Sequence, residues 1–156
     1  TVKSDEDKTG LEIYTNGGYF QDISQLLGSE YYFSAGLLYK ASHHLDVHAG
    51  GFYNIILMKD VLLEPGISST AFYGLELGLS FYPLGKMPIK PFLGVNTAIT
   101  LFPHPFSKNS LRLGFKFPIP KIVSFTLYYS LNHTVSNMLN NYTSHLGGAT
   151  FTVSIM

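Results

Sequence analysis

The sequence has 156 residues, which is enough for one domain. Charged residues make up 13% and hydrophobic residues 46%, whereas an ordinary soluble domain has roughly 25% charged residues, so a charged soluble surface is excluded. The formal net charge is zero and cysteine is absent, which argues against a nucleic-acid partner and excludes disulfides and cysteine chemistry.

Apolar residues are abundant but interrupted. No run approaches the ~18 apolar residues that a transmembrane helix needs. A membrane protein without such helices has to be a closed β-barrel, because only there do all backbone groups find partners within lipid. We therefore expect a membrane β-barrel, and the 11 Tyr, 12 Phe and 15 Gly residues suit its strands.

Residues 1–10 are polar and predict an N-terminal tail, with the barrel domain covering 11–156. From Leu11 onward, apolar residues alternate with polar or small ones in segments of about ten residues, the length of a tilted transmembrane strand. The pattern predicts an all-β fold, an eight-stranded antiparallel up-and-down transmembrane β-barrel. In chain order the predicted strands are Leu11–Phe20, Glu30–Ala41, Leu45–Leu57, Thr70–Pro83, Ile89–Phe102, Ser110–Phe117, Ile122–Asn132 and His145–Ile155.

The predicted connections alternate in length, as short periplasmic turns and longer outer loops do in transmembrane barrels. An even strand number places both termini in the periplasm. We expect a bacterial outer-membrane protein in its mature form, with the signal peptide removed. The short links are Ser42–His44, Leu84–Pro88 and Pro118–Lys121, and the longer ones are Gln21–Ser29, Met58–Ser69, Pro103–Asn109 and His133–Ser144.

The two faces of the strands differ in size and polarity. One face carries large apolar side chains and no charge, and the other carries Gly, Ser, Thr and every charge within a strand. A soluble barrel has the same period with its apolar face inside. An eight-stranded lumen is just wide enough for side chains to fill, however, so the bulky face would overfill it. We therefore predict that the bulky face contacts lipid and that a polar, sterically thin face lines the lumen.

Charges that face a narrow lumen have to pair, because an unpaired buried charge is costly. The structural interpretation is a salt-bridged plug that conducts poorly, and the functional alternative is a gated ion path. We expect His48, on the same face, to hydrogen-bond to these charges. The predicted lumen network, with His48 included, is Glu12, Glu30, Lys40, Asp46, His48, Glu76, Lys90, Arg112 and Lys116.

Aromatic residues on the lipid-facing register predict girdles at both membrane interfaces. Tyr19, Tyr31, Tyr53 and Tyr73 fall towards the long-loop ends of their strands, and Tyr39, Phe81 and Phe117 fall towards the short-turn ends. The remaining histidines lack the spacing of a metal motif, and we expect neither a metal nor a cofactor.

The stretches Tyr73–Leu84 (YGLELGLSFYPL) and Ile89–Val95 (IKPFLGV) resemble the central hairpin of small eight-stranded outer-membrane barrels, of the OmpA transmembrane-domain and OmpX type. The resemblance implies a non-enzymatic protein that serves envelope structure, adhesion or host-factor binding through its extracellular loops. It also implies outer-membrane lipid, lipopolysaccharide, the barrel-assembly machinery and an extracellular host ligand as partners.

A second, local resemblance concerns the end of the seventh predicted strand. The stretch Tyr128–Asn137 (YYSLNHTVSN) is similar to the outer-membrane lipid A deacylases, which implies His133 as base and Ser136 as nucleophile, followed by Asn137. Two residues separate His133 from Ser136, so both lie on one face only if the strand has a bulge. A third alternative is an OmpW-type channel for small hydrophobic molecules, which needs an apolar lumen.

Overall fold

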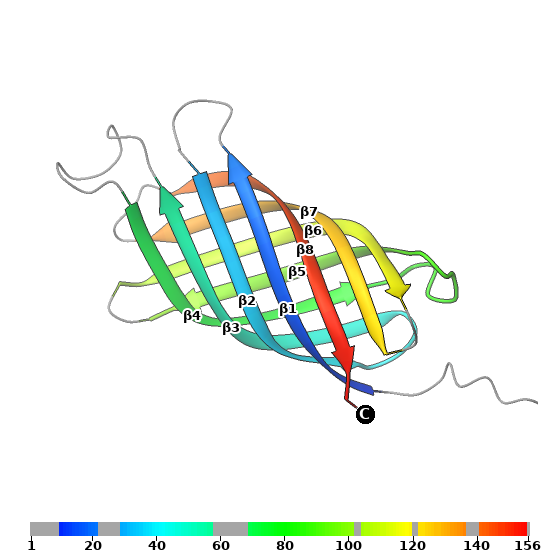
Figure 1. The fold of residues 1–156 in the computed structure, drawn as a ribbon. Helices are drawn as coiled ribbons and strands as arrows, with labels where there is room; N and C mark the ends of the chain where they lie inside the picture. The colour runs from blue at the N-terminus through cyan, green and yellow to red at the C-terminus, as the bar shows by residue number, and fades with distance from the viewer. Residues whose placement is uncertain are drawn as a thin grey trace, which may run out of the picture.

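A computed structural model describes residues 10–21, 29–57, 69–101, 104–119, 122–136 and 141–155. They form eight strands, each antiparallel to the next, and β8 pairs with β1 to close a barrel (Figure 1). The predicted eight-stranded antiparallel up-and-down architecture is confirmed. The strands are β1 (Gly10–Gln21), β2 (Ser29–Lys40), β3 (Leu45–Leu57), β4 (Ser69–Phe81), β5 (Lys90–Thr100), β6 (Phe106–Ile119), β7 (Val123–Ser136) and β8 (Tyr142–Ser154).

We call the end of the barrel that carries Gly10 and Ser154 the terminus end, and the opposite end the loop end. Residues 1–9 of the predicted tail lie outside the described residues. No helix formed by the described part of the chain is long and apolar enough to cross a membrane.

Two predicted loops at the loop end are wrong in their boundaries. β6 begins at Phe106, so most of the predicted loop Pro103–Asn109 is strand. β7 continues to Ser136 and β8 begins at Tyr142, so the predicted loop His133–Ser144 shortens to 137–141. The alternation of lengths also fails, because the terminus-end connection 82–89 is longer than 101–105 or 137–141. Polar residues extend these strands because their backbones pair with residues of the neighbouring strands.

The register assigns one face of every strand to the lumen. Residues with even numbers point inward in all eight strands, and residues with odd numbers point outward. Outward side chains such as Leu37, Leu113 and Phe151 are about half exposed (50%, 50% and 52%), although they are apolar. This outward surface is apolar, as the alternation predicted, and a surface of this kind suits contact with lipid chains rather than with water.

The prediction of a sterically thin lumen is wrong. Even-numbered positions also hold large side chains, and some of them occupy space that a glycine of another strand leaves open. The Tyr14 hydroxyl occupies the space of a side chain at Gly50, at 2.6 Å from an ideal Cβ there, and the Tyr128 ring does the same at Gly148. The large lumen side chains are Tyr14, Tyr32, Leu38, Phe52, Ile56, Phe72, Phe92, Phe106, Tyr128 and Leu146.

The β4–β5 seam is closed along only part of its length. Pairing extends from Leu75↔Ile99 to Phe81↔Leu93, and the described residues of β5 give Ser69–Gly74 no register partner. From Ile99 onward, the end of β5 lies where a Cβ atom on Gly74 would be. The Thr100 hydroxyl donates a hydrogen bond to the Tyr73 carbonyl over 2.5 Å. At the loop end, β4 is therefore held mainly by β3.

Candidate functional site

The loop-end half of the lumen contains a buried ion pair. The Lys108 ammonium donates hydrogen bonds to the Glu30 carboxylate and, over 2.9 Å, to Asn54 Oδ1. The Ser144 hydroxyl donates to the second Glu30 oxygen over 3.1 Å. Lys108 and Glu30 are each only 2% exposed, so this ion pair is buried within the lumen.

Lys108 is a lumen residue that the sequence analysis missed. Its position was assigned to a loop because Ser107, Lys108 and Asn109 are polar neighbours at a strand end. Arg112 and Lys116 have even numbers and face the lumen, and Lys108 has an even number too. This alternation, continued towards the loop end, could have predicted that Lys108 faces the lumen.

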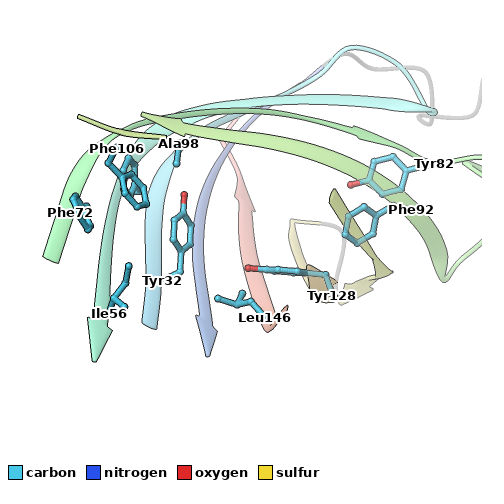
Figure 2. Close-up of a cluster of buried hydrophobic side chains, with 10 residues drawn as sticks. Tyr32, Ile56, Phe72, Tyr82, Phe92, Ala98, Phe106, Tyr128 and Leu146 are labelled. Carbon is cyan, nitrogen blue, oxygen red and sulfur yellow. The ribbon is translucent and has the colours of Figure 1, made fainter. Parts of the chain in front are cut away.

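Aromatic side chains fill the lumen beside this ion pair. Phe72 stacks on Phe106 with 4.3 Å between ring centroids, and Phe52 lies 5.8 Å from Phe106 and 5.7 Å from Tyr32. Figure 2 shows Phe72, Phe106 and Ile56 together, well apart from Tyr82 and Phe92. The loop-end lumen therefore holds apolar ring contacts as well as an ion pair.

Glu76 is the centre of a hydrogen-bond network halfway along the barrel. Its carboxylate accepts from the Tyr14 hydroxyl over 2.5 Å, from the Tyr32 hydroxyl, and from Asn96 Nδ2 over 3.2 Å. Because Asn96 donates with Nδ2, its Oδ1 accepts from His48 Nε2 over 3.0 Å, which fixes a proton on that nitrogen. The network joins β1, β2, β3 and β5 to β4 through side chains alone.

Arg112 is held by aromatic faces. Its Cζ lies 4.8 Å from the Tyr128 ring centroid and 6.0 Å from that of Tyr32, distances at which a cation is attracted to the ring. The residue is 8% exposed, and its Nε is buried with no hydrogen-bond partner. Arg112 thus separates the loop-end cluster from the terminus-end half of the lumen.

The terminus-end half contains two further ion pairs. Lys116 binds Asp46 over 3.0 Å, and Lys40 binds Glu12. Lys90 lies directly opposite Lys116 in the β5–β6 register. Burial and then the negative charge of Asp46 raise the pKa of Tyr82, in the adjoining turn, well above its ordinary value.

A cavity of about 40 Å³ lies in this half of the lumen, and His48, Arg112 and Lys116 are among the residues that line it. Because one water needs roughly 10–15 Å³ of such space, the cavity has room for about three waters. Four of the predicted lumen charges therefore form two ion pairs with one another, Lys116–Asp46 and Lys40–Glu12. Glu30 pairs with Lys108 instead, and Glu76 and Arg112 are held by hydrogen bonds and by aromatic rings respectively.

The predicted girdle residues all lie on the outward face. Tyr19, Tyr39, Tyr53, Tyr73 and Phe81 are 45–60% exposed, and Tyr31 and Phe117 are half-buried. Tyr19 pairs with Tyr31 across β1 and β2, and their ring centroids are 5.0 Å apart. The loop-end tyrosines therefore gather on β1 to β4.

The residues of the deacylase alternative are not brought together. β7 pairs with β6 in unbroken register from Ile119↔Val123 to Phe106↔Ser136, so there is no bulge. His133 consequently points outward and Ser136 inward, while Asn137 lies outside the described residues. Among the described residues no group of three His, Cys, Asp or Glu side chains is placed to hold a metal ion.

The OmpW-type alternative needs an apolar lumen, but charged side chains are buried along this lumen, and one group of apolar side chains lies at the loop end. There Ile56, Phe72 and Phe106 pack together and are 1–3% exposed, so they fill the space rather than line a passage.

The fold is similar to that of solved membrane barrels. Neisserial surface protein A (NspA) matches with 14% identity over 94% of this chain and 97% of its own, at a TM-score of 0.60. A de novo designed protein, TMB2.3, solved by NMR in solution, matches with 14% identity over 98% of both chains, at a TM-score of 0.55. Neither a protein-family model nor a curated protein matches the sequence. The chain has the fold of a small transmembrane β-barrel, which confirms the predicted fold class.

Proposed function

We propose that this chain is a non-enzymatic barrel of the bacterial outer membrane whose lumen is closed to ions and whose activity resides in its loops. The single observation that supports the proposal most is the Lys108–Glu30 pair, which is buried beside the Phe52, Phe72 and Phe106 rings. An ion would have to displace both a salt bridge and an aromatic cluster to pass.

The partners follow from this proposal. The outward surface is apolar and suits outer-membrane lipid and lipopolysaccharide, and insertion falls to the barrel-assembly machinery. The connections 22–28, 58–68, 101–105 and 137–141 share the loop end, and we propose that they face the outside. Envelope structure, adhesion or binding of a host ligand, as in the OmpA and OmpX type, is then the task of these loops.

Planar-bilayer recording tests the closed lumen. We expect no steady single-channel current from the wild type, and measurable openings from the double variant Lys108→Ala/Phe106→Ala, because it removes both components of the seal. The matched control is Tyr53→Ala, an outward change on β3 that leaves the lumen intact. Large, steady currents from the wild type would refute the proposal, as would a double variant as silent as the control.

A further inference from the structure

The outward face contains a row of polar residues near the loop end of β5 to β8. Thr97, Asn109, His133 and Thr143 are successive register partners across these four strands. Asn109, His133 and Thr143 are exposed, and the Thr97 hydroxyl donates to Asn109 Oδ1 over 2.9 Å, which leaves the Asn109 amide free to donate outward. The row thus offers donors and acceptors to a neighbour outside the barrel.

This polar row does not mark the end of the apolar band. On β5, Ile99 and Leu101 continue beyond Thr97 towards the loop end and are 45% and 81% exposed. On β7, His133 stands between Leu131 and Val135, each 40% exposed. On the other half of the barrel the loop-end positions are tyrosines. The row therefore places hydrogen-bonding groups within a lipid-facing surface, between apolar residues of the same strands.

Small outward side chains form a strip along β8, from the polar row towards the middle of the barrel, and we call this strip the groove. After Thr143 and His145, the outward positions of β8 are Gly147 and Ala149. Gly147 pairs with Tyr19 on β1 and with Tyr129 on β7, and nothing lies within 4 Å of a side chain built on it. β8 lies between β1 and β7, so two tyrosines flank a small-residue floor (Figure 1).

Tyr129 and His145 close the upper end of this groove on one side. The Tyr129 hydroxyl and His145 Nδ1 share a hydrogen bond, and their rings lie 5.6 Å apart. A polar rim above an apolar groove is complementary to a single lipid. The rim suits the junction between the head group and the acyl chains, and the groove suits one acyl chain.

We propose that this face of β5 to β8 binds an acylated disaccharide glycolipid of the surrounding leaflet. The row crosses three inter-strand spacings of about 4.8 Å, roughly 14 Å in all, which matches a disaccharide better than one glycerol. Every Lys and Arg of the described strands faces the lumen, so neutral Asn, Thr and His side chains bind hydroxyl and acyl carbonyl groups rather than phosphates. A chain lies over Gly147 and Ala149.

Lipid retention after detergent extraction tests this site. The barrel is reconstituted in phosphatidylethanolamine vesicles that contain lipid A or, in parallel, phosphatidylglycerol, and retained lipid is counted by native mass spectrometry. We expect one lipid A per wild-type barrel, and a loss of roughly fivefold or more in His133→Leu, which removes hydrogen bonds, and in Gly147→Leu, which fills the groove.

The matched control is Gly51→Leu, an outward glycine of β3 whose added Cβ meets only the Gly74 carbonyl at 3.6 Å. It should retain lipid A as the wild type does. Circular dichroism verifies that each variant is folded. Equal retention in all variants, or equal retention of phosphatidylglycerol, overturns the proposal. So does a wild-type dimer that the variants convert to a monomer, because the face would then bind a second copy.

Discussion

Lys108 shows how a single residue can decide the state of the lumen. Its ammonium has the Glu30 carboxylate and Asn54 as partners, and its Nζ lies 4.9 Å from the Tyr32 ring centroid. A carboxylate left alone in this surrounding would have neither water nor a cation near it, and the cost of that exceeds what the ion pair itself contributes.

We expect Lys108→Met to lower the free energy of unfolding by about 3–5 kcal/mol, since it leaves Glu30 buried and unpaired. Adding Glu30→Gln should recover much of the loss, because the remaining group is neutral. Urea titration of the barrel in detergent micelles measures both. Lys86→Met, in the exposed turn 82–89, is the control. If Lys108→Met were as stable as that control, the ion pair would not contribute to the stability of the barrel.

The strand is the scale at which the sequence was most informative. Period-two alternation predicts which face of each strand meets lipid, because the lipid-facing residues are mostly apolar. It did not predict the large lumen side chains, since Tyr128 fits only because Gly148 stands beside it on another strand. That complementarity depends on register, which a single strand does not reveal. The loop-end boundaries of β6 and β7 were also not predicted, because polar residues such as Asn109 and His133 are typical of loops.

Adjacent glycines of β8 provide a matched test of this packing. Gly148→Ala places a methyl group against the Tyr128 ring and should destabilise the barrel by about 1–3 kcal/mol. Gly147→Ala points outward into open space and should leave stability unchanged or raise it by about 0.4–1 kcal/mol. Thermal unfolding in micelles compares the two. Equal losses in both variants would show that the Tyr128 contact is unimportant.

At the scale of the whole molecule, closure of the barrel is uneven. Every strand has two neighbours, but the described residues of β4 and β5 form no register pair beyond Leu75↔Ile99, and Leu75 and Leu101 beside this seam are 74% and 81% exposed. Four of the lumen charges that the sequence placed inside form ion pairs with one another. The partners of the others, and the point where β4–β5 pairing ends, depend on the tilt and register of all eight strands.

Hydrogen exchange should locate this seam. The Tyr73 carbonyl points towards β5, so the backbone groups of Ala71 and Tyr73 lie on the unpaired edge of β4. We expect their amides to exchange at least tenfold faster than those of Leu77 and Leu79, which pair with β5. NMR in micelles measures the rates. Uniform protection along β4 would mean that the seam is closed in solution.

The network around Glu76 also bears on how the barrel is assembled. Its donors come from β1, β2 and β5, so an incomplete sheet that lacks the first two strands would carry a carboxylate without Tyr14 and Tyr32. Partly formed barrels are therefore penalised until the strands that are last to meet have closed. We therefore expect an all-or-none folding transition, in which insertion and closure are coupled steps and half-open intermediates do not accumulate.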